Sequence, residues 1–179
     1  MRIGLYMATQ WPAGADLGGE MANLIEQTRV AKANGFSSVL VGQHFLSEPL
    51  QMIQAEPLLA RLVAEGEGME FGIAIVLLAM QNPVIAAEYA ASLDWITGGK
   101  YILGVGVGYR REEFEALQVP FERRGARFDD YMVAMKKVWS GDVVEHESDF
   151  LSWHGFKSYP LPVQKSGQKP SVPIIMGGK

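Results

Sequence analysis

The sequence contains no cysteine, no long apolar run and no excess of basic charge, and each absence excludes a class of protein. Without cysteine the chain can form no disulfide framework, thiolate zinc site or iron–sulfur cluster, and it has no cysteine nucleophile. The longest apolar run, Ile73 to Met80, is far shorter than the roughly 20 residues that cross a bilayer. With 16 basic and 20 acidic side chains the formal charge is −4, so no basic face exists for nucleic acid. We therefore expect no membrane span and no nucleic-acid partner.

The sequence also lacks an export signal and the spacing of a metal site. The apolar stretch before Trp11 is too short for the hydrophobic region of a signal peptide. The three histidines are scattered, without the spacing of metal ligands. These features predict a soluble, cytoplasmic protein without a metal. Its 179 residues, 48% of them hydrophobic, suffice for a single domain with a sizeable core.

What the sequence does contain is a succession of short β-branched runs, each followed by a stretch with helical periodicity. The runs that predict strands are Ile3–Met7, Ser38–Val41, Phe71–Val76 and Tyr101–Val105, and a fifth is Val172–Met176. The first four begin about 30 to 35 residues apart, which is the length of a strand–helix–strand unit. Because these runs are apolar on both faces, they are typical of buried parallel strands.

Four helices are expected between these strands. The first carries the apolar face Met21, Leu24, Ile25, Thr28 and Ala31, and the second covers about Glu56 to Ala64. Asn82-Pro83 opens the third helix, for which we predict the inward stripe Ile85, Tyr89, Leu93 and Ile96. Phe128, Tyr131, Met132, Met135, Val138 and Trp139 form the stripe of the fourth. Residues 142–170 are polar and proline-containing, and we interpret them as an excursion with a short hairpin.

Successive parallel strand–helix units are compatible with a doubly wound sheet or with a closed (β/α) barrel. A closed barrel needs about 250 residues, whereas the units here end after four and the start of a fifth. A half barrel leaves a strand edge unpaired and an apolar sheet face uncovered. The chain is therefore either a fragment, or it associates with something that completes it, such as a homo-oligomer or a missing C-terminal half.

Three stretches of the sequence carry a family resemblance. They are Val41–Phe45, the segment from Gln81 to Gly106, and Gly108–Phe114 together with Pro120–Asp130. In order and spacing they resemble the luciferase-like monooxygenases, flavin-dependent barrel enzymes that include bacterial luciferase and deazaflavin-dependent oxidoreductases. Gln43 stands where that family usually has an acidic residue. The family's chain is about twice as long. The resemblance thus implies the N-terminal half of a single TIM-type (β/α) barrel domain over residues 1–179, with four βα units and the fifth strand.

His44 is the candidate catalytic residue. In a parallel barrel the site lies at the carboxyl ends of the strands, and His44 follows the second strand directly. Imidazole titrates near neutral pH, which suits a general acid or base. The resemblance matches His44 to a histidine close to the reactive face of the flavin. The alternative is a histidine that hydrogen-bonds a backbone carbonyl at a strand end.

Other candidates are assigned to the cofactor. The resemblance implies a bulge with a non-prolyl cis peptide bond at Ala74 and Ile75 that supports the flavin ring; without it, this segment is a plain buried strand. Gly104 and Gly106 let the backbone approach a planar ring closely, and Tyr109 follows in the same loop. The alternative for these glycines is a tight loop that only needs positive φ.

Arg127, with Arg124, lies at the start of the fourth long helix, where two guanidinium groups can hold a phosphate. Equally, these arginines can form surface ion pairs with neighbouring acids. Tyr6, Trp11 and Gln43 follow the first two strands and are candidates for the substrate pocket.

The remaining titratable candidates receive structural interpretations. Glu112 and Glu113 begin a helix, where the dipole favours acids, and adjacent helical residues diverge too much to form a catalytic pair. His146 and His154 belong to the excursion, and we expect them to be surface or loop residues.

The resemblance implies a flavin-dependent monooxygenase or oxidoreductase that acts on a small organic substrate. FMN is the expected cofactor, with a deazaflavin coenzyme as the alternative, and molecular oxygen is the co-substrate of a monooxygenase. Two other functions stay open. One is a non-catalytic flavin-binding or structural relative of the same fold. The other is a different barrel enzyme, an isomerase or aldolase without a flavin.

Overall fold

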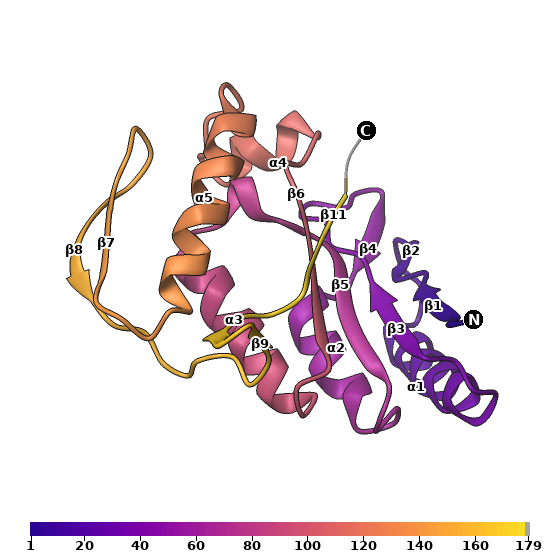
Figure 1. The fold of residues 1–179 in the computed structure, drawn as a ribbon. Coiled ribbons are helices and arrows are strands. Elements are labelled where there is room, and N and C mark those ends of the chain that lie inside the picture. The colour runs from indigo at the N-terminus through magenta and orange to yellow at the C-terminus, as the bar shows by residue number, and fades with distance from the viewer. Residues whose placement is uncertain (178–179) are drawn as a thin grey trace.

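The computed structural model describes residues 1–177, and its centre is a parallel sheet of five strands (Figure 1). Every neighbouring pair in this sheet is parallel, and the order in space is the order along the chain. The strands are β1 (Gly4–Met7), β3 (Ser38–Val41), β5 (Glu70–Leu77), β6 (Tyr101–Gly106) and β11 (Ile174–Met176). The prediction of an α/β fold with successive parallel strands is confirmed.

Helices connect the strands, and the capping residues explain where two of them begin. Asp16 caps the first helix by accepting a hydrogen bond of 3.0 Å from the Gly18 backbone N–H. Asn82 caps the third in the same way, and Pro83 occupies its first turn. The helices are α1 (Leu17–Ala33), α2 (Ala55–Val63), α3 (Pro83–Ile96), α4 (Arg111–Ala116) and α5 (Arg124–Val138), with a 3-10 turn, η1 (Leu78–Met80).

The two faces of the sheet differ in burial. On one face Val39, Val41 and Leu103 are buried beneath the helices, with α2 packed on β5 and α3 on β6. On the other face Leu40 and Ile102 are only half-buried. Within residues 1–177 the sheet does not close on itself, because β1 and β11 form its two ends. The uncovered face therefore combines apolar side chains with access to solvent.

The inward stripe predicted for α3 is wrong. Ile85, Tyr89 and Ile96 are each about half exposed, and of the predicted stripe only Leu93 is buried. The face that packs into the protein consists mainly of alanines, namely Ala86, Ala87, Ala90 and Ala91. Small side chains let α3 lie close to its neighbours, so the bulky residues are left on the outer side. The apolar faces predicted for α1 and α5 are confirmed.

Three pairs of short antiparallel strands lie outside the main sheet. They are β2 (Gln10–Pro12) with β4 (Leu50–Met52), β7 (Val144–Glu147) with β8 (Ser152–Phe156), and β9 (Lys165–Ser166) with β10 (Lys169–Pro170). The last two pairs fall in the segment 142–170, and the β7–β8 hairpin extends beyond α5 at the left of Figure 1.

His146 corrects another expectation, since it is not a surface residue. Its side chain is only 6% exposed, and its Nε2 lies 2.9 Å from Asp130 Oδ1 on α5. The hydroxyl of Ser148 donates to the other oxygen of Asp130. His154, by contrast, is exposed as expected. His146 therefore fastens the β7–β8 hairpin to α5.

A buried carboxylate joins the segment 142–170 to the sheet. Asp94, near the end of α3, has no solvent-exposed surface, and Gln164 donates to both of its oxygens. The distances are 2.9 Å from the Gln164 backbone N–H and 2.6 Å from its side-chain amide. The same amide also donates to the Tyr101 carbonyl at the start of β6.

Among residues 1–177, no helix has the length and apolarity to span a membrane.

Candidate active site

A pocket of about 710 Å³ opens at the carboxyl ends of the strands, on the face that the helices leave uncovered. Its volume lies within the range of about 300 to 1,000 Å³ that is common for small-molecule sites. The residues that line it are Tyr6, Gly42, Gln43, His44, Ala74, Ile75, Leu77, Val107, Gly108, Tyr109 and Gly177. They lie in or directly after β1, β3, β5, β6 and β11, so every strand of the sheet contributes to one site.

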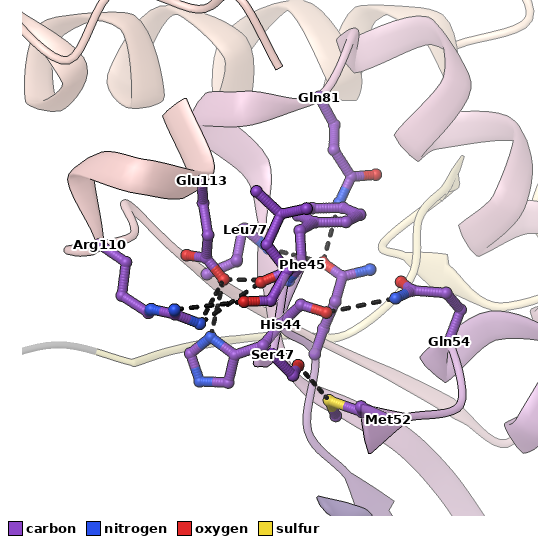
Figure 2. Close-up of polar contacts among 11 residues, drawn as sticks. His44, Phe45, Ser47, Met52, Gln54, Leu77, Gln81, Arg110 and Glu113 are labelled. Carbon is purple, nitrogen blue, oxygen red and sulfur yellow. Dashed lines mark hydrogen bonds and ion pairs between the residues drawn. The ribbon is translucent and has the colours of Figure 1, made fainter. Parts of the chain in front are cut away.

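The histidine on this pocket is held by a buried carboxylate (Figure 2). His44 Nδ1 lies 3.0 Å from Glu113 Oε1, and the Phe45 backbone N–H donates to the same oxygen at 3.0 Å. An ionised carboxylate can only accept hydrogen bonds, so the His44 nitrogen that faces it, Nδ1, is the one that carries the proton. The side chain of His44 is 26% exposed, whereas that of Glu113 is 1% exposed. In this tautomer Nε2 is the acceptor of the His44 ring, and it lies on the side of the ring away from Glu113.

Arg110 also contacts the carboxylate of this pair. Its guanidinium lies 3.8 Å from Glu113 Oε1 and donates to the carbonyls of Phe45 and Leu46. Gln54 donates to the His44 carbonyl at 3.2 Å. A nearby cation offsets part of the cost of burying a carboxylate. The backbone that carries His44 is therefore fixed at several consecutive residues, as Figure 2 shows.

Gln43 lines the pocket, but its amide is already engaged with protein groups. The amide oxygen accepts from the Leu77 backbone N–H at 3.0 Å and from the Gln81 side chain at 2.9 Å. The amide nitrogen donates to Glu56 Oε1 at 2.8 Å. Gln43 is 4% exposed. Its contacts thus join β3, β5, α2 and the segment before α3.

The peptide bond between Ala74 and Ile75 is cis, as the family resemblance implied. Both residues line the pocket, and the register between β5 and β6 shifts at this point. Gly104 and Gly106 do not line the pocket but pack behind this segment. A Cβ at Gly104 would collide with the Ile73 carbonyl oxygen, and one at Gly106 would collide with Ile75 Cδ1. Close packing against backbone explains Gly104, whereas a side chain at position 106 would first displace the end of Ile75, and neither glycine has a positive φ.

Tyr6 and Tyr109 form two further walls of the pocket. Both rings are largely exposed. The Tyr109 ring meets the His44 ring edge-on, with the ring centroids 6.1 Å apart. Tyr6 lies over Gly42, where a Cβ would come within 2.5 Å of the Tyr6 hydroxyl. Two phenol hydroxyls and one imidazole therefore border the same space.

Two further candidates, Trp11 and Arg127, do not line this pocket either. Trp11 is buried in β2 and packs in the core. Arg127 is also buried, and its guanidinium donates to the carbonyls of Ala79 and Pro120. Burial lowers the pKa of Arg127 from its ordinary value. Because its donors are directed at backbone carbonyls, Arg127 fixes the turn before α3 to the start of α5.

Glu113 is the site residue that the sequence interpretation missed. It was paired with Glu112 as a helix-start acid, but Glu112 is exposed while Glu113 turns inward against His44. The available signal was its position shortly after a strand that ends at the same edge as His44. Phe114, its neighbour, is also fully buried, and this marks the inward face of α4.

Comparison with known proteins agrees with this geometry. The family model described as luciferase-like monooxygenase matches residues 1–179. The chain belongs to this family. Among curated relatives, it is 28% identical over 148 residues to an F420-dependent glucose-6-phosphate dehydrogenase of Rhodococcus hoagii, a match that covers 78% of this chain and 44% of the relative. It is 29% identical over 109 residues to an FMNH(2)-dependent dimethylsulfone monooxygenase of Pseudomonas putida, covering 59% of this chain and 29% of that protein.

A solved structure matches the fold of this luciferase-like chain. It is the oxygenating constituent of 3,6-diketocamphane monooxygenase from Pseudomonas putida, in complex with FMN. The TM-score is 0.78 at 20% identity, and the match covers 98% of this chain and 51% of that one. The chain thus spans about half, or less, of the length of the proteins it matches.

Proposed function

We propose that this chain forms the first five strands of a (β/α) barrel and carries one wall of the active site of a flavin-dependent oxidoreductase. The observation that carries the proposal is the His44–Glu113 pair on the rim of the 710 Å³ pocket. The substrate is a small organic molecule, and molecular oxygen is the second substrate if the reaction is a monooxygenation. FMN is the first choice of cofactor, and a deazaflavin coenzyme is the alternative.

The pocket residues fit a flat heteroaromatic ring. Ala74 and Ile75 form a floor, and Gly104 and Gly106 leave room behind it because they carry no side chains. The Tyr109 ring borders the opening beside His44. We therefore assign Ala74, Ile75 and Tyr109 to the ring of the cofactor, with Gly104 and Gly106 supporting the floor. Tyr6 is the substrate-side wall.

A bound flavin supplies the redox chemistry, and the chain's own residues supply proton transfer and orientation. With its proton on Nδ1, His44 offers Nε2 as a base toward the pocket. After it takes up a proton, the charged imidazole faces the Glu113 carboxylate, which stabilises it. Glu113 therefore positions His44 and does not itself face the pocket.

The experiment is an equilibrium titration of the protein, produced from its whole gene, with FMN, FMNH2 and F420. We expect binding of one of these cofactors, seen as a change in its fluorescence or absorbance. Replacing His44 by Ala should leave this binding within about threefold and lower turnover at least about 100-fold, since a general acid or base contributes that much. His154→Ala, at an exposed position, is the matched control.

The outcomes separate the alternatives. Cofactor binding without turnover in wild type would favour a non-catalytic relative, whereas unchanged turnover in His44→Ala would mean that His44 is not the catalytic group. Absence of binding to all three cofactors would contradict the proposal. Preference for F420 over FMN would place the chain with the deazaflavin-dependent members, as in the relative from Rhodococcus hoagii.

A further inference from the structure

Gln43 occupies the wall between two cavities. It lines the pocket with His44, and it also lines a second cavity of about 660 Å³ between α2 and α3. Its amide is buried in that wall and bonded to Glu56, Leu77 and Gln81. Leu77 is the last residue of β5 and itself lines the His44 pocket. Gln43 therefore links helix α2 to the pocket side of β5.

The hydrogen-bond pattern determines which way the amide points. The Leu77 backbone N–H can only donate, so the atom 3.0 Å from it is the Gln43 oxygen. The Gln43 nitrogen is then the atom that faces Glu56, and it donates at 2.8 Å to a carboxylate. One side chain thus satisfies a backbone donor and a carboxylate acceptor at once.

We infer that Gln43 is a positioning residue, which through Leu77 sets the cofactor-facing wall formed by the end of β5. The Leu77 N–H lies two residues beyond Ile75, so it fixes the segment that carries the pocket floor. The use of cofactor binding to measure this positioning role rests on the function proposed above. The bond itself does not depend on that function.

The amide is required because of Glu56. A carboxylate at position 43 keeps an oxygen for Leu77 and Gln81, but it turns a second oxygen toward the Glu56 carboxylate. Two carboxylates at hydrogen-bond distance repel each other unless they share a proton. Exchanging the two residue types reverses the polarity of this bond, because the amide at position 56 then donates to the carboxylate at position 43. Exchanging the residues at positions 43 and 56 therefore tests the interaction between them.

The experiment compares wild type, Gln43→Glu, Glu56→Gln and the double variant that combines both changes. In Gln43→Glu we expect repulsion from Glu56 to displace the oxygen that accepts from the Leu77 N–H. Hydrogen exchange in a peptide covering residues 74–78 should then be faster and FMN or F420 binding about tenfold weaker, since losing a bond to a charged group costs that much. The double variant should return both quantities to within about threefold of wild type. Gln27→Glu, an exposed change on α1, is the matched control.

The results decide the inference even if one variant folds poorly. A double variant that is no better than Gln43→Glu, in folding or in exchange at residues 74–78, would overturn it. Unchanged exchange in a folded Gln43→Glu would do the same. If wild type binds none of the cofactors, the proposed function fails, whereas the exchange comparison still tests the role of Gln43.

Discussion

Two fully buried carboxylates near β6 are used in different ways. Asp94 lies close to the start of this strand and accepts hydrogen bonds on both oxygens, both from Gln164. Glu113, beyond the other end of the strand, receives all its contacts on Oε1, from His44, Phe45 and Arg110. Its Oε2 has no hydrogen-bond partner within the described residues 1–177.

The difference distinguishes a structural carboxylate from the one that the proposed function uses. A buried group whose bonds are all made by immobile partners stabilises one arrangement of the chain. A buried carboxylate with an unused oxygen is costly and calls for an explanation, of which a catalytic role is one. Glu113 faces a partly exposed histidine on a pocket, which agrees with the positioning role that we propose for it.

The largest effect that tests this comparison is expected for Glu113→Gln. We expect turnover to fall about 100-fold with a smaller change in KM, because the neutral amide keeps an oxygen for His44 Nδ1–H but no longer stabilises the charged imidazole. Nitrogen-15 NMR of the histidines should show the Nδ1–H form in wild type and in the variant, because the amide oxygen still accepts. Glu112→Gln removes the same charge at an exposed position and serves as the control.

If Glu112→Gln and Glu113→Gln lowered turnover equally, net charge and not the His44 contact would be the cause. A different tautomer of His44 in Glu113→Gln would show that the amide oxygen does not replace the carboxylate oxygen, and the loss of turnover could then not be assigned to charge alone.

A second test is Asp94→Asn, which should lower stability by about 1–3 kcal/mol. The asparagine nitrogen would face an N–H donor of Gln164, since both oxygens of Asp94 are acceptors. Urea unfolding measures the change, with Asp129→Asn on the exposed side of α5 as the control. The histidine NMR spectrum should stay as in wild type. A loss of stability no greater than that of the control would mean that the Asp94–Gln164 contact is dispensable.

The smallest effect is expected for Glu65, a half-buried carboxylate that pairs with two arginines. Hydrogen bonds from Arg61 and Arg29 lower the pKa of Glu65. A carboxyl group with a lowered pKa in the folded state contributes stability above its unfolded pKa of about 4.3, and this contribution is lost as pH falls through the folded value. Wild type should therefore be slightly more stable than Glu65→Gln at pH 7, and the difference should disappear in acid. Thermal unfolding at pH 7 and pH 3 measures it, and a difference that grew in acid would contradict the assignment.

Much of the fold could be predicted because the strands and caps depend on local sequence. Ser38–Val41 matches β3 without a change of bounds, and the Asn82-Pro83 cap begins α3 as expected. The packing of α3 could not be predicted in the same way. Hydrophobic periodicity favours the bulky Ile85 and Tyr89, whereas close helix packing selects alanine for the buried side. The side-chain size that fits the buried side of α3 depends on neighbouring residues that are distant in sequence.

In the candidate site, too, some residues could be predicted from the sequence and others could not. His44 could be placed because a residue directly after a parallel strand must lie at the site edge. Glu113 could not, since its contact with His44 joins residues 69 positions apart and depends on the rotation of α4. The prediction that Arg127 binds the cofactor relied on its residue type alone. Its charge suggested a phosphate, but its burial directs it to backbone carbonyls.

The order of the strands bears on how the molecule assembles. Because each strand of the sheet pairs with the one made just before it, the sheet can grow one crossover at a time as the chain is synthesised. From β1 to β6 each pairing joins strands one crossover unit apart, whereas β11 pairs with β6 across the long segment between residues 106 and 174. This topology allows assembly in one direction, with each strand as the template for the next.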